Sequence, residues 1–462
     1  MGGRGCQPAN SSRLSWIAVE WPLRLARPAW EVHMTDRRLL AKCAWRLIPV
    51  MGLLYLVNYI DRVNAGFAAL TMNKDLGFSP SVFGLGAGIF FGGYLLFQIP
   101  SNVIVERLGA RVSVFGMMVV WGALSAVTAL IQTPLAFYVL RFLLGIAEAG
   151  FFPAMIFYLT LWYPRSERAL FTAAFTCAIP LSGIVGGPVS GLILQNMNGL
   201  LGLHAWQWLF VIEGLPVCLL AFAVLKVLPD GPAQASWLTD PEKKTIALAM
   251  ADETAAEKSD LATALRDPRV LAIACAGLGR GAALYGATLW MPLIVQAMGF
   301  SNLMVGFIVP IPYLASVVAI VVWGYSSDRS GDRIWHVALP TLLAAFGFAG
   351  AAVFTDDTLV LLCLTLAMMG LLAAASPHFV LASSFLRGSA AAGSIALLNS
   401  GTSLGGFVGP FLVGVLKDQT GNYALAMAVL AFGLLLSALI ILGVGRMLRP
   451  AELASPVLAD AD

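Results

Sequence analysis

The sequence predicts an all-α integral membrane protein with twelve transmembrane helices in two bundles of six. Three observations support this prediction: the composition, the number of long apolar runs, and a loop motif that recurs in each half. Of the 462 residues, 59% are hydrophobic and only 11% are charged, against roughly 25% charged residues in an average soluble domain. This composition excludes an ordinary soluble enzyme, and a net charge of +3 is too mild to indicate a nucleic-acid partner.

The first 33 residues contain several tryptophans and arginines but no apolar core of about 7–15 residues like that of a signal peptide. Met34 begins a polar and basic stretch of the kind that leads into a first membrane helix. We therefore expect translation to start at Met34 rather than Met1, and residues 1–33 to be a disordered tail. The six cysteines are scattered without paired spacing, which predicts neither a disulfide framework nor a metal site.

Charges, prolines and turn residues bound twelve apolar runs of about the 20 residues that cross a bilayer. The first six lie near 47–70, 82–105, 112–131, 135–161, 169–194 and 206–228, and the last six near 270–297, 303–325, 336–354, 358–381, 390–414 and 422–446. The polar stretch between the two sets predicts a cytoplasmic loop with short helices. The predicted parts are thus a first bundle (34–228), a central loop (229–268), a second bundle (269–449) and a C-terminal tail (450–462).

The positions of lysine and arginine predict the orientation, because basic residues resist translocation. With the N-terminus inside, the outer loops contain only Lys74 and Lys417 among the 28 basic residues. Arg62, Arg141 and Arg280 lie within spans. We therefore predict that both termini are cytoplasmic.

A loop motif is repeated in the two halves. Glu106-Arg107-Leu108-Gly109-Ala110-Arg111 lies between spans 2 and 3, and Asp328-Arg329-Ser330-Gly331-Asp332-Arg333 lies between spans 8 and 9, 222 positions later (328 minus 106). Opposite charges at helix ends can pair, and glycine permits a tight turn. The repeat predicts a duplicated six-helix unit, which is typical of transporters with a site between their halves. The candidate gating residues are Glu106, Arg107, Gly109, Arg111, Asp328, Arg329, Gly331 and Arg333.

Glycines recur every fourth residue on three spans, which leaves one face of each helix without side chains. These ladders are Gly84, Gly88 and Gly92 on span 2, Gly183, Gly187 and Gly191 on span 5, and Gly401, Gly405 and Gly409 on span 11. Such faces allow close helix approach in lipid. The two interpretations are static packing and a sliding interface, and three ladders favour sliding.

Four charged residues lie inside spans 1 and 4, where an unpaired charge is costly and indicates function. They are Asp61, Arg62, Arg141 and Glu148. A purely structural alternative is that Asp61–Arg62 and Arg141–Glu148 are ion pairs that hold the two spans together. No charged counterpart lies 222 positions after Asp61, Arg141 or Glu148. This absence favours a functional role for these residues over a purely structural one.

These residues combine a group that binds anions with groups that exchange protons. Arg62 is always charged and can bind a carboxylate through two hydrogen bonds. Asp61 and Glu148, partly desolvated, are expected to gain and lose protons near neutral pH. A carboxylate beside Arg62 would repel an anionic substrate until it is protonated, which is the logic of symport.

Other polar and aromatic groups are candidates to complete a binding site. Arg280 lies about ten residues into span 7, too deep to reach the interface easily, so it is a candidate second anion contact, with a buried pair or a water-facing charge as the alternative. The remaining candidates are Tyr94, Asn399, His378, Tyr285 and Thr402. For each of these there is a plainer role, in an interfacial belt or in a bond to its own helix backbone. Glu213 is expected to anchor span 6 rather than to carry protons.

From residue 40 to 447 the chain resembles the anion:cation symporter family of the major facilitator superfamily. The segments that carry the resemblance are Tyr59-Ile60-Asp61-Arg62-Val63-Asn64, Gln98-Ile99-Pro100-Ser101-Asn102, residues 106–111, residues 141–153, Trp206-Gln207-Trp208-Leu209-Phe210, Glu213-Gly214-Leu215-Pro216, Trp237-Leu238-Thr239 and Leu404-Gly405-Gly406-Phe407-Val408-Gly409-Pro410.

The resemblance implies proton-coupled uptake of organic acids across a bacterial inner membrane, by rocking of two six-helix bundles around a central cavity. It implies that Arg62, Tyr94 and Asn399 contact the substrate, that Asp61 and Glu148 take protons, and that Arg141 is linked to Glu148. The proton gradient would drive transport without a cofactor, and we expect a monomer. Within the family the segments look most like bacterial permeases for tartrate, phthalate and related acids.

Span 10 departs from the family pattern. It reads Pro377-His378-Phe379-Val380-Leu381-Ala382 where many relatives have a tryptophan and a second proline, and span 11 has a serine or threonine where relatives often have a second asparagine. With Arg280 as a second cation, these departures favour a dicarboxylate or an aromatic acid over a sugar acid, which stays the alternative substrate. A membrane enzyme, a channel and a non-transporting sensor on a transporter scaffold are the alternatives from other classes.

Overall fold

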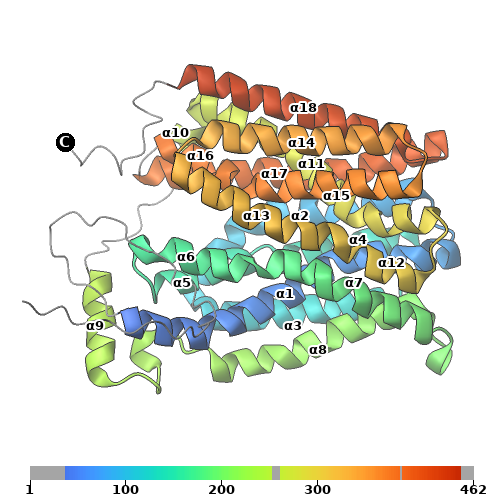
Figure 1. Cartoon of the computed structure of the whole chain (residues 1–462). Helices are drawn as coiled ribbons and strands as arrows, with labels where there is room; N and C mark the ends of the chain where they lie inside the picture. Colours follow the sequence, from blue (N-terminus) through green and yellow to red (C-terminus); the bar gives the residue numbers. More distant parts are fainter. Residues whose placement is uncertain (1–36, 252–260, 386–387, 449–462) are drawn as a thin grey trace, which may run out of the picture.

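A computed structural model describes residues 37–251, 261–385 and 388–448 of the chain. Within these ranges every regular element is a helix, and twelve spans are long and apolar enough to cross a membrane. The predicted all-helical architecture is confirmed. Figure 1 shows the long helices running side by side, with the first half, blue to green, below the second half, yellow to red.

The first half builds its six spans from eight α-helices. They are α1 (Arg37–Leu76), α2 (Pro80–Leu108), α3 (Ala110–Thr128), α4 (Pro134–Glu148), α5 (Phe151–Thr160), α6 (Arg165–Thr176), α7 (Ala178–Asn196) and α8 (Ala205–Val227). Helices α4 and α5 form one span, and α6 and α7 form another. Helix α1 begins at Arg37 rather than near residue 47 as predicted, so it extends beyond its apolar run by more than two turns.

The second half follows a connector that contains the short helices η2 (Pro232–Gln234), α9 (Asp240–Ala251) and α10 (Leu261–Arg266). Its helices are α11 (Pro268–Ala297), α12 (Asn302–Ile308), α13 (Pro310–Ser330), α14 (Arg333–Val353), α15 (Asp357–Ala373), α16 (Ala375–Phe385), α17 (Gly388–Thr420) and α18 (Ala424–Met447). Here α12 and α13 form one span, and α15 and α16 form another.

Four spans are interrupted, and each interruption falls about four residues before a proline. Since proline has no N–H and its ring collides with the carbonyl of residue i−4, the helix is broken there. Pro153 breaks the fourth span at Ala149, so Glu148 is the last residue of α4. The same spacing relates Pro180, Pro312 and Pro377 to the ends of α6, α12 and α15.

The connector is bound to both halves at one end of the bundle, here called the connector end, where α1 begins and α18 ends (Figure 1). Helix α9 is joined to α1 by an ion pair of 2.8 Å between Lys42 Nζ and Glu242 Oε1. The Lys42 ammonium and the backbone N–H of Thr239 lower the pKa of Glu242 to about 2. Trp237 stacks on Trp162 at 5.5 Å between ring centroids. Helix α10 packs instead against α11 and α17 of the second half.

The two halves contact each other toward the other end of the bundle, here called the opposite end. The backbone N–H of Ser81 donates to Asp418 Oδ2 at 2.8 Å, joining α2 to α17. The Gln296 amide donates to the Leu70 carbonyl at 3.3 Å, joining α11 to α1. These residues all lie near the ends of α1 and α11 or the matching ends of α2 and α17, so this conformation is closed at the opposite end.

Two of the three glycine ladders lie between the halves. A Cβ at Gly187 of α7 would lie 2.7 Å from the carbonyl oxygen of Gly306 in α12, and one at Gly84 of α2 would lie 2.5 Å from that of Pro410 in α17. Glycine is therefore required for these close approaches. The third ladder, on α17, packs against α11 of its own half. This third ladder therefore packs helices inside the second half rather than between the halves, and sliding at the ladder faces stays a prediction.

Candidate functional site

The first half contains a buried cluster of charged side chains from α1 and α4. Asp61, Arg62, Arg141 and Glu148 are each at most 7% exposed. Burying charges in an apolar bundle is costly unless they are paired or hydrogen-bonded. The arrangement of their partners therefore defines what this cluster can do.

Arg62 and Glu148 form the ion pair at the centre of this cluster. Arg62 Nη2 and Nε donate to Glu148 Oε2 at 3.0 and 3.3 Å, and Asn58 Nδ2 donates to the same oxygen at 3.0 Å. Glu148 Oε1 has no hydrogen-bond partner in the described part of the chain. The structural alternative from the sequence paired Asp61 with Arg62 and Arg141 with Glu148. The structure instead joins Arg62 to Glu148, the last residue of α4.

Aromatic rings surround the two guanidinium groups. The Arg62 guanidinium carbon lies 5.0 Å from the ring centroid of Tyr94 and 5.4 Å from that of Phe90. The Arg141 guanidinium carbon lies 4.9 Å from the same Phe90 ring. Cations are attracted to ring faces at such distances. Tyr94, a predicted substrate contact, thus lies against Arg62.

Asp61 and Arg141 occupy the rest of the cluster. Asp61 Oδ1 accepts hydrogen bonds from the Ser125 hydroxyl of α3 and, at 3.2 Å, from Asn64 Nδ2. The Arg141 guanidinium makes no hydrogen bond to any described residue, although it interacts electrostatically with Asp61 and Glu148. Arg141 therefore lies near both carboxylates without a hydrogen bond to either.

The second half contributes a separate buried pair, Arg280 of α11 and His378 of α16. Arg280 Nη2 donates to the Leu371 carbonyl at 3.1 Å, and in the described ranges Arg280 forms no ion pair with an acid. Both ring nitrogens of His378 are buried without a partner among those residues. A Cβ at Gly277 would lie 3.1 Å from His378 Nε2 and 3.3 Å from Thr402 Oγ1. The absence of a side chain at Gly277 lets His378 and Thr402 approach α11.

Tyr285 links the two halves beside the charged cluster. It lies on α11, and its ring centroid is 4.1 Å from that of Phe91 on α2. It also interacts electrostatically with Arg62. Thr402 instead donates to the Leu398 carbonyl of its own helix at 3.0 Å. This is the backbone hydrogen bond that the sequence offered as the alternative to substrate binding. Asn399 is half-buried on α17 and has no hydrogen bond to other described residues.

The family of the chain follows from comparison with known proteins. The family model of the Major Facilitator Superfamily matches residues 51–392, with a second match over 298–457. The chain belongs to this superfamily. A protein of Agrobacterium vitis named as a tartrate transporter is 45% identical over 414 residues, which cover 89% of this chain and 92% of that protein.

A second relative agrees with this assignment to the superfamily, and a solved structure has the same fold. The metabolite transport protein NicT of Pseudomonas putida is 37% identical over 418 residues, covering 89% of this chain and 95% of that protein. The crystal structure of a bacterial homologue of the human lysosomal transporter Spinster, at 16% identity, superposes with a TM-score of 0.71 and covers 89% of this chain and 98% of that one. The protein is thus a multi-pass transporter of the bacterial inner membrane and not an enzyme.

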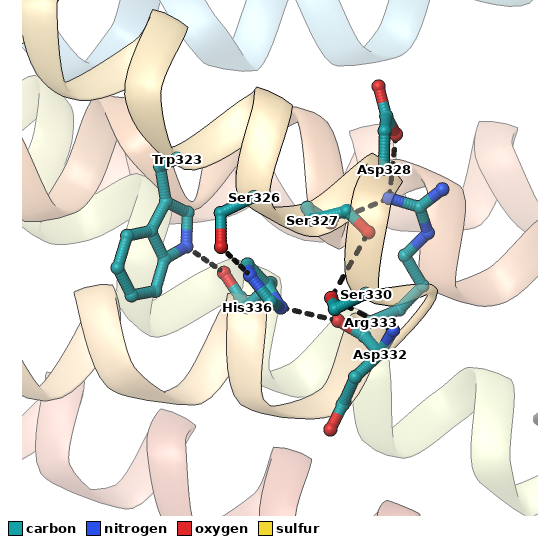
Figure 2. Close-up of polar contacts among 8 residues, drawn as sticks. All are labelled: Trp323, Ser326, Ser327, Asp328, Ser330, Asp332, Arg333 and His336. Carbon is teal, nitrogen blue, oxygen red and sulfur yellow. Dashed lines mark hydrogen bonds and ion pairs between the residues drawn. The ribbon is translucent and has the colours of Figure 1, made fainter.

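The glycines of the repeated loops both adopt a positive φ in this superfamily member, but the two turns differ, with ψ values of 159° at Gly109 and −9° at Gly331. Gly109 and Gly331 have φ values of 79° and 69°, a conformation that favours glycine. In the second loop Arg333 Nη1 donates to Asp328 Oδ1 at 2.9 Å and to Ser327 Oγ at 2.6 Å (Figure 2). The opposite charges of this loop therefore pair as expected.

The first loop pairs differently. Arg111 forms an ion pair of 2.8 Å with Asp230 of the connector and donates to the Leu225 carbonyl. Glu106 and Arg107 are exposed, as is Arg329 in the second loop. The expected pairing inside the loop is wrong for Arg111, because the connector supplies a closer acid. The sequence offered no signal for Asp230, which lies in a loop far along the chain.

The second loop also contains contacts that the motif did not predict. His336 lies between Asp332, whose carbonyl its Nδ1 contacts at 2.5 Å, and Ser326, whose hydroxyl its Nε2 contacts at 3.0 Å. Trp323 Nε1 donates to the His336 carbonyl at 2.9 Å (Figure 2). These bonds fix the start of α14 against the end of α13.

We predict that substitutions at Arg62 and Glu148 have strongly non-additive effects on the free energy of unfolding. Glu148→Leu leaves a buried guanidinium without its acid and should destabilise the protein by about 3–5 kcal/mol. Arg62→Met combined with Glu148→Leu removes both charges and should recover most of that loss. Thermal unfolding of the purified single and double variants measures this. Additive losses in the double variant would show that the two residues are not a pair.

Proposed function

We propose that the protein is a proton-coupled symporter that takes up an organic carboxylate by alternating access of its two bundles. The preferred substrate is a dicarboxylate such as tartrate or an aromatic acid such as phthalate. The observation that carries this proposal is the Arg62–Glu148 ion pair. The name of the Agrobacterium vitis relative supports an organic acid as the substrate.

Coupling follows from competition for one guanidinium. In the paired state, two nitrogens of Arg62 are held by Glu148 Oε2. A substrate carboxylate needs those same donors and is repelled by the negative charge of Glu148. Protonation of Glu148 removes that charge and frees Arg62, so substrate and proton bind together. Glu148 is also the last residue of α4, where the helix dipole opposes a negative charge and Arg62 offsets it.

The second half supplies a further cation for the substrate. Arg280 is buried, and its hydrogen bond to the Leu371 carbonyl leaves its charge uncompensated. A dicarboxylate can satisfy Arg62 with one end and Arg280 with the other, and Tyr285 lies on the same helix as Arg280, beside the Arg62 cluster. A substrate that contacts both bundles stabilises the conformation in which they are close together. The second cation therefore supports a dianion over a sugar acid with a single carboxylate.

The direction of opening follows from the predicted orientation. With both termini in the cytoplasm, the connector end faces the cytoplasm and the opposite end faces outward. The contacts of Ser81 with Asp418 and of Gln296 with Leu70 then close the outer side. In this proposal the conformation is inward-facing, and Arg62 is paired with Glu148 after substrate and proton have left. Outward opening requires those contacts to separate.

We predict that Glu148→Gln separates exchange from accumulation. Glutamine keeps the size and one acceptor oxygen but cannot release a proton, so a proton gradient can no longer drive uptake. In proteoliposomes, accumulation of radiolabelled tartrate should fall to the equilibrium level, while exchange against internal tartrate continues. Normal accumulation by this variant would contradict the assigned role of Glu148.

We predict that the two arginines have different selectivity. Arg62→Lys loses the second hydrogen bond to a carboxylate, worth about 1.5–3 kcal/mol, and should weaken all carboxylate substrates roughly tenfold or more. Arg280→Gln should weaken dicarboxylates much more than monocarboxylates. Counterflow with labelled tartrate, phthalate, benzoate and gluconate measures this. Wild-type affinity in Arg62→Lys, or preferred transport of gluconate by the wild type, would contradict the proposal.

A further inference from the structure

Glu213 is a third buried carboxyl in the first half, near the middle of α8. It is 9% exposed. Ser190 Oγ of α7 donates to Glu213 Oε1 at 3.2 Å, and Oε2 has no hydrogen-bond partner within the described ranges. A single hydroxyl is a weak partner for a buried carboxylate, since such groups are normally paired or accept several hydrogen bonds. Anchoring to Ser190 alone does not account for a carboxyl at this position.

The helix packing brings Glu213 close to Asp61. Helices α3 and α8 cross closely at Gly122 and Gly214, where a Cβ on Gly214 would lie 2.7 Å from the Gly122 carbonyl oxygen. Ser125, which lies over Gly214, donates to Asp61. The Asn64 amide donates to Asp61 and also lies against the Glu213 carboxyl, which interacts electrostatically with Asp61. Asp61, Asn64 and Glu213 are therefore neighbours in one polar row.

The charges in this part of the bundle do not balance if every carboxyl is ionised. Three carboxyls, Asp61, Glu148 and Glu213, accompany two guanidiniums, those of Arg62 and Arg141. Glu148 has Arg62. Asp61 also faces the Glu148 carboxyl, and it has two hydrogen-bond donors together with the charge of Arg141. Glu213 has no cation and faces the charge of Asp61. Two neighbouring buried carboxylates cannot both ionise without compensation, so one proton resides on this pair.

The other groups around Glu213 do not supply the missing positive charge. The helices packed against α8 are α1, α3 and α7. Helix α7 contains no titratable residue, and α3 contains only Arg111, which lies at the connector end and is paired with Asp230. The remaining titratable residues are Cys218 and Lys226 on α8 and, on α1, Arg37, Arg38, Lys42, Cys43, Arg46, Tyr55, Tyr59, Lys74 and Asp75. The basic residues among these lie near the helix ends.

We propose that Glu213 is a proton-carrying residue that shares one proton with Asp61, and that this proton resides on Glu213 in the present conformation. When the proton moves to Asp61, Glu213 becomes the carboxylate and Asp61 becomes neutral, so the charge of the pair is unchanged. Asp61 then no longer attracts Arg141, which is left to interact with Glu148. This inference rests on the proposed proton-coupled symport, and it adds a second proton-holding pair behind the substrate cluster.

The test compares Glu213→Gln with Glu213→Asp in proteoliposomes, using radiolabelled tartrate as the probe. Both variants disturb the packing at α8, but only aspartate can carry a proton. Glu213→Gln should reduce proton-driven accumulation at least about tenfold and flatten its dependence on pH, while tartrate exchange continues. Glu213→Asp should retain pH-dependent accumulation within about threefold of the wild type.

Two outcomes overturn the inference while leaving the proposed function intact. One is wild-type accumulation and pH dependence in Glu213→Gln. The other is an equal loss in both variants, which would make Glu213 a structural anchor. If the wild type shows no proton-driven accumulation, the proposed symport itself fails. If Glu213→Gln does not fold, infrared spectra of the wild type and of Glu213→Asp replace it. The wild type should show the band of a protonated carboxylic acid at neutral pH, and this band should shift in Glu213→Asp. An unshifted band contradicts the inference.

Discussion

An arginine and a glutamate buried together in an apolar bundle depend on each other, and this dependence organises the first half of the protein. Arg62 and Glu148 stabilise each other's charged forms, since an unpaired buried charge costs several kcal/mol. The pair therefore joins α1 to the end of α4 through their side chains. Pro153 contributes by ending α4 immediately after Glu148, which places the carboxylate at a helix terminus rather than inside a continuous helix.

The two halves share a fold but divide the chemistry. The first half contains the carboxyls and two guanidiniums, whereas the second contains Arg280 and His378 without an acid among its described buried residues. A duplicated scaffold thus carries an asymmetric site. In the proposed mechanism, proton exchange occurs in the first bundle, and the second bundle binds the substrate through the Arg280 guanidinium. In this mechanism the substrate links the two bundles, because its carboxylates would contact both.

The spans, the repeated loops and the buried charged residues could be predicted from the sequence, because apolar length, glycine turns and intramembrane charges are local signals. The pairing of those charges could not. Asp61 and Arg62 are adjacent, about 100° apart around α1, and hydrophobicity does not tell which of them faces α4. The structure turns Arg62 toward Glu148 and Asp61 toward Ser125. Likewise, Glu213 and Asp230 gain their roles from helices far away in the sequence.

In the proposed mechanism a substrate carboxylate and a proton bind together because both act on the Arg62–Glu148 pair. Isothermal titration calorimetry of tartrate binding to the purified protein, in buffers with different protonation enthalpies, measures the protons taken up on binding. Linkage between the two equilibria predicts uptake of about one proton per tartrate by the wild type near neutral pH, and none by Glu148→Gln. Tight tartrate binding by the wild type without proton uptake would contradict the account.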